Sequence, residues 1–100
     1  MSKGYALITG ATGGLGKAFV YTLASRGENL LLTGRSIEKL AELQADLQEK
    51  YPALDVRIYD ADLSNESSRY EMMGKITGDG VRISTLVNVA GADVQKALTE

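Results

Sequence analysis

Glycines crowd the segment Thr9–Gly16, which directly follows the apolar run Tyr5–Ile8. Gly10, Gly14 and Gly16 fit the pattern T-G-x-x-x-G-x-G. Glycine has no Cβ, so the backbone N–H groups of such a turn can approach a diphosphate that a side chain would push away. We expect the first glycine to allow the sharp exit from a strand, the second to admit the diphosphate and the third to let a helix pack closely.

A helical pattern follows this turn, and the first N–H groups of a helix have no partners within the helix and carry about half a positive charge. Thr12 can add a hydroxyl donor to the same place. A glycine-rich turn can also be purely structural and bind no ligand. Its position between a buried strand and an amphipathic helix favours the anion-binding interpretation.

The residues Leu32–Ser36 are placed to select the nucleotide. About 20 residues after the glycine turn, a site for NAD usually presents Asp or Glu to the ribose 2′-hydroxyl, and no carboxylate stands here. Arg35 instead offers a planar fork of donors that matches a phosphate, and Ser36 can add its hydroxyl or its backbone N–H. We therefore predict NADP(H). The alternative is that Arg35 is a solvated charge and Ser36 only a helix cap, although capping and phosphate contact are compatible.

Two later segments can complete a nucleotide site. Asp62 can accept a hydrogen bond from the adenine amino group and Leu63 can cover the ring, or Asp62 only begins the turn before the next helix. The segment Asn88–Gly91 ends the fourth predicted strand beside the glycine turn, where small residues leave room for the nucleoside. Asn88 can tie neighbouring strands together, and a purely structural amide is the alternative.

Composition excludes several classes of function. The chain has no cysteine and no histidine, so disulfides and thiolate metal sites are excluded, the commonest metal ligand is missing, and we predict no metal. A net charge of −2 without a basic block disfavours nucleic acid or an anionic membrane as a partner. No run approaches the roughly 20 apolar residues of a membrane span, and no signal peptide stands at the start, which predicts a cytoplasmic protein.

No tyrosine of the chain is predicted to be catalytic. None of the five tyrosines is followed four residues later by lysine, and we expect each of them to pack in the core or lie on the surface.

The elements that must position these residues alternate. We predict buried strands over residues 5–9, 29–33 and 83–89 and an alternating strand over 54–59. Helices are predicted over 14–26, 37–51 and from a cap at Ser64 to about 77. One hundred residues make one domain at most. Strands that alternate with helices imply a parallel sheet with helices on both faces and strand order 3-2-1-4, with a cofactor crevice between strands one and four.

Hydrophobic spacing predicts which helix faces are buried. In the first helix the predicted stripe is Leu15, Ala18, Phe19 and Leu23, and in the third it is Tyr70, Met73 and Ile76.

Taken together, the motifs resemble the short-chain dehydrogenase/reductase family, in its ordinary-length, NADP-preferring branch. Four motifs coincide in order and spacing over the whole chain: Thr9–Gly16, Gly34-Arg35, Asp62-Leu63 and Asn88–Gly91. Gly10, Gly13 and Gly16 also fit the glycine pattern of the longer epimerase-like branch, but the pattern at 88–91 favours the ordinary branch. Val89 is a departure, because the family usually has a second Asn there.

The resemblance implies a Rossmann-type fold and hydride transfer between NADP(H) and a carbonyl or alcohol substrate. Carried over residue by residue, cofactor binding falls on Gly10, Thr12, Gly14, Leu15, Gly16, Arg35, Ser36, Asp62, Leu63, Asn88, Ala90 and Gly91. The catalytic Asn, Ser, Tyr and Lys of the family have no counterparts in the chain.

We therefore predict that residues 1–100 are the cofactor-binding half of such an enzyme, truncated after the fourth strand and inactive alone. A nucleotide-binding, NADP-sensing module without catalysis is the alternative, and a piece that binds nothing is a third possibility. An unpaired edge on the fourth strand predicts a homo-oligomer formed through that strand.

Overall fold

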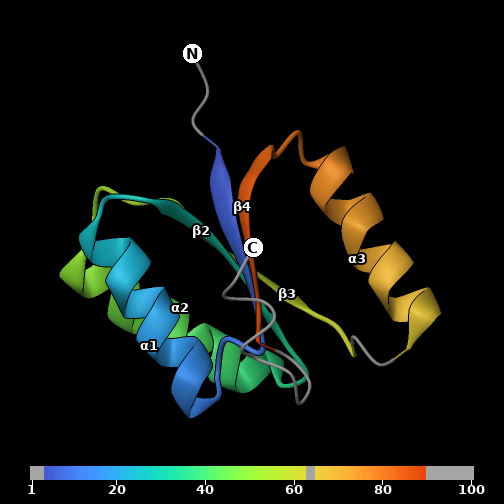
Figure 1. The fold of residues 1–100 in the computed structure, drawn as a ribbon, viewed down its shortest axis with the longest axis horizontal. Helices are drawn as coiled ribbons and strands as arrows, with labels where there is room; N and C mark the ends of the chain where they lie inside the picture. Colours follow the sequence, from blue (N-terminus) through green and yellow to red (C-terminus); the bar gives the residue numbers. More distant parts are fainter. Residues whose placement is uncertain (1–3, 63–64, 90–100) are drawn as a thin grey trace.

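The computed structural model describes residues 4–62 and 65–89. Its elements, in chain order, are β1 (Tyr5–Thr9), α1 (Gly14–Ser25), β2 (Asn29–Gly34), α2 (Ile37–Lys50), β3 (Val56–Asp60), α3 (Glu66–Gly78) and β4 (Ile83–Asn88). All strand pairs are parallel and the sheet order is β3-β2-β1-β4, which confirms the predicted topology. Helices α1 and α2 cover one face of this sheet and α3 lies on the other (Figure 1).

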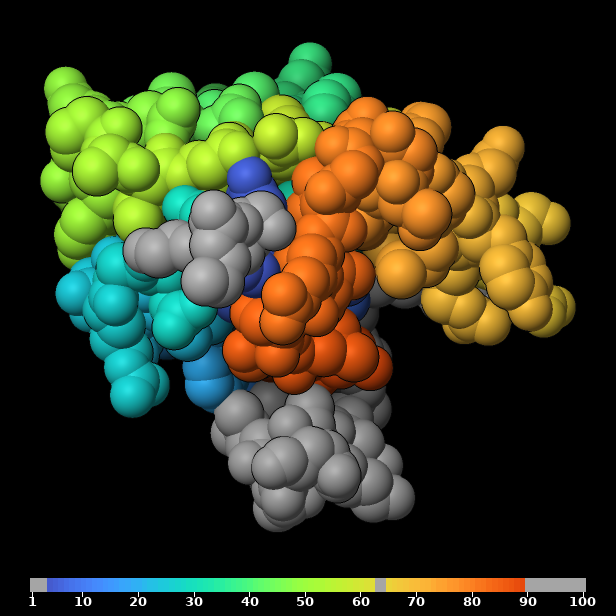
Figure 2. All heavy atoms as spheres, turned by 90° about the horizontal axis from the view of Figure 1, so that it is seen from above, coloured from blue at the N-terminus to red at the C-terminus, as the bar shows by residue number. Residues whose placement is uncertain are grey.

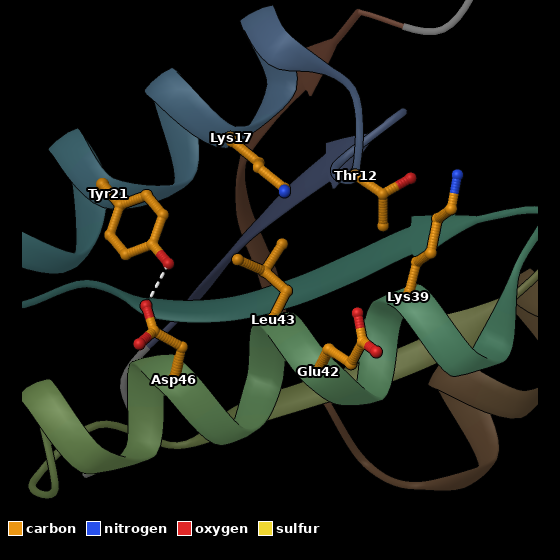
Figure 3. A pocket seen from close by; sticks show the side chains of 7 residues that line it. All are labelled: Thr12, Lys17, Tyr21, Lys39, Glu42, Leu43 and Asp46. Carbon is orange, nitrogen blue, oxygen red and sulfur yellow. Dashed lines mark hydrogen bonds between the residues drawn. The ribbon is translucent and has the colours of Figure 1, made fainter.

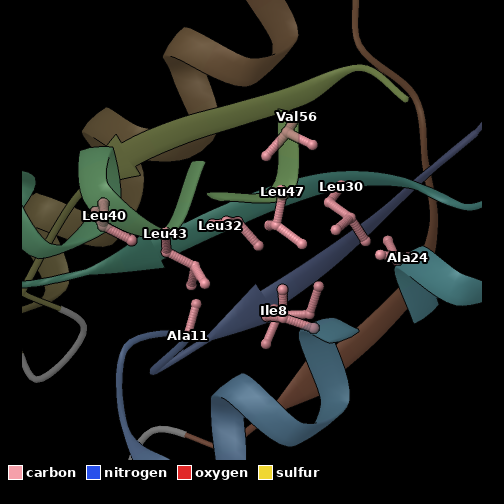
Figure 4. Close-up of a cluster of buried hydrophobic side chains, with 11 residues drawn as sticks. Ile8, Ala11, Ala24, Leu30, Leu32, Leu40, Leu43, Leu47 and Val56 are labelled. Carbon is pink, nitrogen blue, oxygen red and sulfur yellow. The ribbon is translucent and has the colours of Figure 1, made fainter. Parts of the chain in front are cut away.

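The sheet divides the core into two clusters, because successive side chains of a strand point to opposite faces. Ile8, Leu30 and Leu32 pack with α1 and α2 in the larger cluster (Figure 4). Leu7 and Leu31 belong to the smaller cluster on the α3 side. Strands β1 and β2 are thus buried on both faces, as their unbroken apolar runs predict.

The predicted stripe of α1 is wrong at Leu15 and Ala18, which are exposed, whereas Leu23 packs against the core as predicted. The helix buries Gly16, Val20 and Ala24, whereas Leu15 is 47% exposed. These residues are four apart and so share one face; Gly16 and Ala24 are small and let the helix lie close to the sheet, and this contact turns the larger Leu15 side chain toward solvent.

The predicted stripe of α3 is correct only at Ile76. Met72 and Ile76 are buried, whereas Tyr70 is 70% and Met73 41% exposed. Successive helical residues are about 100° apart, so a stripe fixed by residues 72 and 76 places Tyr70 on the far side of the helix.

Element ends are set by local hydrogen bonds. The third strand begins at Val56 rather than residue 54, because the Leu54 N–H donates to the Tyr51 carbonyl in a turn. Asn65 caps α3 by accepting from the Ser68 N–H at 3.1 Å, whereas the predicted cap, Ser64, lies outside the described residues.

The fourth strand is not buried as predicted. Among the described residues it pairs with β1 alone, at the edge of the sheet, and Leu86 on it is 59% exposed. The orange-red atoms of this strand lie on the surface of the molecule in Figure 2. In the described ranges, no helix is both long and apolar enough to cross a lipid bilayer.

Candidate cofactor-binding site

The glycine turn leaves β1 through Gly10, whose φ of 63° is a conformation that side-chain-bearing residues rarely adopt. The Gly13 N–H donates to the Gly10 carbonyl at 3.2 Å and closes the turn. The Ala11 N–H donates to the Thr33 carbonyl at 3.1 Å. The turn is therefore tied to the end of the neighbouring strand β2.

Two glycines of the turn have different surroundings. A Cβ on Gly16 would lie 2.0 Å from the Gly10 carbonyl oxygen, so no side chain fits there. A Cβ on Gly14 would meet nothing within 4 Å, and this residue is exposed. Gly16 is thus required by the fold, whereas the bare backbone at Gly14 leaves open space into which an external group can come. The residues of the turn fit a diphosphate in this respect.

The start of α1 differs from the starts of the other helices. Its N-cap, Gly13, makes no side-chain hydrogen bond, and no acidic residue stands in the first turn. Helix α2 is capped by Ser36, and helix α3 carries Glu66 in its first turn. The first N–H groups of α1 are therefore left without a capping side chain, in keeping with a site for an anion.

Arg35 lies in a hollow of about 460 Å³ between the end of β2 and α3. The exposed guanidinium shares this hollow with the basic side chain of Lys75 and with three carboxylates. The acidic lining residues are Asp60, Asp62 and Glu71. Because of these three carboxylates, the hollow is better suited to a group that donates hydrogen bonds than to an anion.

The backbone of Asp62 forms the turn that leads to α3. Its carbonyl accepts from the Asn65 N–H at 3.0 Å, and its own N–H donates to Ser68 Oγ at 2.9 Å. The turn role considered for this residue is confirmed, and its side chain also lines the hollow beside Arg35. A contact with adenine stays a prediction.

A second hollow of about 360 Å³ separates α1 from α2. Figure 3 shows Thr12 and Lys39 at one end of this α1–α2 groove, with the amine of Lys17 between the helices. Ser36 caps α2 beside it, accepting from the Lys39 N–H at 3.2 Å. The predicted cap is confirmed, and a phosphate contact of Ser36 stays a prediction.

The other end of the α1–α2 groove is closed by a contact between the helices. The Tyr21 hydroxyl donates to Asp46 Oδ2 (Figure 3), and Lys50 Nζ lies 3.3 Å from the same oxygen. The hydrogen bond to the carboxylate, with a smaller effect of burial, raises the pKa of Tyr21 to about 12. The phenol is protonated at neutral pH and, through this hydrogen bond, links α1 to α2.

Asn88 ties β4 to β1 at the carboxyl edge of the sheet. The Thr9 hydroxyl donates to Asn88 Oδ1 at 2.7 Å, and the Val89 N–H donates to Thr9 Oγ1 at 3.0 Å. The predicted link between neighbouring strands is therefore confirmed.

The described site residues gather at one edge, because the carboxyl ends of parallel strands meet there. The turn residues follow β1, Arg35 and Ser36 follow β2, Asp62 follows β3 and Asn88 ends β4. Leu63, Ala90 and Gly91 lie outside the described residues. The crevice predicted between the first and fourth strands stays a prediction, because two of the residues expected to border it are among these three.

Sequence reasoning missed Lys17 and Lys39, which line the groove next to Thr12. One available signal was spacing, since Lys39 stands four residues after Arg35 at a predicted helix start.

Comparison with known proteins agrees with this geometry. The sequence model of the short chain dehydrogenase family matches residues 4–100. The chain belongs to the short chain dehydrogenase family.

Curated relatives of this family member are reductases. A very-long-chain 3-oxoacyl-CoA reductase of Phaeosphaeria nodorum is 40% identical over 89 residues, covering 87% of this chain and 26% of that protein. The very-long-chain 3-oxooacyl-coA reductase let-767 of Caenorhabditis elegans is also 40% identical over 88 residues, covering 87% of this chain and 28% of that protein. The chain thus spans about a quarter of the length of these relatives.

Solved structures share the fold. L-sorbose reductase from Gluconobacter frateurii, complexed with NADPH and L-sorbose, superposes with a TM-score of 0.83 at 26% identity, over 91% of this chain and 34% of that one. A short-chain dehydrogenase from Sphingobium yanoikuyae in complex with NADPH gives a TM-score of 0.78 at 31% identity, over 89% and 34% of the two chains.

Proposed function

We propose that this chain is the NADP(H)-binding part of an oxidoreductase that transfers hydride between NADP(H) and a carbonyl or alcohol substrate. The observation that carries the proposal is the contrast within the turn, where the fold requires glycine at Gly16 but leaves the bare backbone at Gly14 open to an external group. The absence of a capping side chain at the start of α1 supports the same conclusion. Further support comes from the solved NADPH complexes of the family.

Each part of the nucleotide has a proposed place. The diphosphate lies at the start of α1, where Gly14, Leu15 and Gly16 present backbone N–H groups and Thr12 a hydroxyl. Arg35 and Ser36 select the 2′-phosphate. Asp62 and Leu63 hold the adenine, while Asn88, Ala90 and Gly91 border the nucleoside. The nicotinamide supplies or accepts the hydride when the cofactor is bound.

The chain by itself is proposed to be catalytically inactive. In the family resembled here a tyrosine moves the proton and a lysine assists it, and none of the five tyrosines in this sequence has a lysine four residues later. The similarity to very-long-chain 3-oxoacyl-CoA reductases favours, among carbonyl substrates, a ketone like that of a 3-oxoacyl-CoA ester. A cytoplasmic location stays a prediction.

The test is titration of the chain with NADPH and with NADH by isothermal calorimetry, for the wild type and for Arg35→Ala. The wild type should bind NADPH more tightly than NADH. The substitution removes one charge-assisted contact, which corresponds to about one to two decades of affinity for NADPH. NADH binding should hardly change. Equal losses for the two nucleotides would contradict the assignment of Arg35, and no binding of either one would contradict the proposed function.

A further inference from the structure

Two segments far apart in the sequence meet at the mouth of the α1–α2 groove. A Cβ on Gly34 would lie 3.6 Å from Thr12 Oγ1, so the end of β2 touches the glycine turn. The hydrogen bond between the Ala11 N–H and the Thr33 carbonyl fixes this approach. A group bound beside Thr12 is therefore also beside the residues that follow Gly34.

Lys39 lies at this mouth. Its backbone N–H is held by Ser36 Oγ at 3.2 Å, which fixes the first turn of α2. Its side chain and that of Thr12 line the same end of the groove (Figure 3). An ammonium from the first turn of α2 and a hydroxyl from the glycine turn thus line one end of the groove.

The charge of Lys39 is available to a ligand. Within the residues that the structure describes, no carboxylate lies within 4 Å of its ammonium. Asp46, in the same groove, already bonds Tyr21 and Lys50, which leaves Glu42 as the remaining acidic side chain of the lining. Lys39 is exposed, so its pairing with an anion costs little desolvation.

Arg35 is less well placed to hold a phosphate alone. It lines the hollow on the α3 side together with three carboxylates, whose negative charge would repel an anion that entered that hollow. A phosphate next to Ser36 has a more favourable surrounding on the side of Lys39 and Thr12.

We infer that Lys39 is a second residue that determines specificity for the phosphorylated cofactor, contacting the 2′-phosphate from the groove side while Arg35 contacts it from the other. This inference rests on the proposed function, because it concerns the same nucleotide. Lys17, which brings the same charge to the groove from α1, serves as the matched control.

The experiment measures dissociation constants of adenosine 2′,5′-bisphosphate and of adenosine 5′-monophosphate for the chain. The two probes differ only in the 2′-phosphate. An exposed ion pair contributes little, so Lys39→Ala should reduce the preference for the bisphosphate by about fivefold. Lys39→Arg should retain most of the preference, and raising the salt concentration should diminish the difference between wild type and Lys39→Ala.

Lys17→Ala should leave the preference between the probes unchanged. An equal fall in preference for both lysine variants would overturn the inference, because the effect would then be a general one of groove charge. An unchanged preference in Lys39→Ala, with a wild type that discriminates, would also overturn it and leave the proposed function standing. A wild type that binds neither probe would overturn the proposed function and with it this inference.

Discussion

Gly16 faces the carbonyl oxygen of Gly10 so closely that a Cβ on residue 16 would lie 2.0 Å from that oxygen. Both groups are backbone, so neither can swing aside. The beginning of α1 can therefore pack against the exit from β1 only because residue 16 has no Cβ. The same turn leaves Gly14 open, which separates a glycine that the fold needs from one that a ligand would use.

Substituting Gly16→Ala should therefore destabilise the chain. Overpacking against backbone costs about 1–3 kcal/mol or more, and chemical denaturation would measure the loss in free energy of unfolding. The matched control is Gly14→Ala, whose Cβ meets open space, so its stability should be unchanged or slightly higher.

The two variants should also differ in nucleotide binding. Gly14→Ala should weaken NADPH although the fold is intact, because the new methyl group stands where the diphosphate would approach. A stable Gly16→Ala chain would contradict the structure of the turn. A Gly14→Ala chain with wild-type affinity would contradict the proposed place of the diphosphate.

The contact between Tyr21 and Asp46 should make stability depend on alkaline pH. The pKa of Tyr21 is raised from 10.0 to about 12, so the folded state favours the protonated phenol. Its contribution is complete below pH 10, the ordinary value, and is lost as pH rises through about 12.

Denaturation of wild type and Tyr21→Phe at several pH values would measure this contribution. The phenols of Tyr5 and Tyr59 also have raised pKa values, so only the difference between the two proteins isolates Tyr21. The difference in stability should be constant below pH 10 and shrink above it. A difference that does not change up to pH 12 would contradict the interhelical hydrogen bond.

Thr33 and Thr9, which are neighbours across β2 and β1, should differ in how loss of the hydroxyl changes the free energy of unfolding. Thr33 Oγ1 is buried and has no hydrogen-bond partner among the described residues. Thr33→Val removes an unsatisfied polar group and should leave the free energy of unfolding unchanged or raise it by up to about 1 kcal/mol.

Thr9→Val is the matched control, because it breaks the bond to Asn88 and should cost about 1 kcal/mol. Equilibrium unfolding in urea would compare both variants with the wild type. A clear loss of stability in Thr33→Val would mean that its hydroxyl has a partner, such as an internal water.

We also expect copies of the chain to associate through β4, which is an edge of the sheet among the described residues. Unpaired N–H and C=O groups and the 59% exposed side chain of Leu86 make such an edge prone to pairing. Light scattering should show dimers or larger species for the wild type, and Leu86→Lys should shift them toward monomer. A monomeric wild type at high concentration, with fast amide exchange along residues 86–89, would refute this expectation.

Local patterns in the sequence determined the order of elements and the sheet. Unbroken apolar runs such as Tyr5–Thr9 read as strands buried on both faces, and a strand followed by a helix permits few topologies. The glycine turn and the cap at Ser36 were also predictable, because each depends on residues within a few positions of one another. The described residues of the four motifs lie at one edge because the strands are parallel.

Tertiary contacts alone decided which helix faces are buried and which charges meet. Leu15 and Tyr70 are apolar enough for a core, yet both point to solvent. The close packing of Gly16 fixes the rotation of α1, and the burial of Met72 and Ile76 fixes that of α3. Lys39 and Thr12 are distant in sequence and meet only because β1 and β2 are adjacent. Sequence periodicity limits the choice of faces, but the energy of packing depends on the surface that each helix meets.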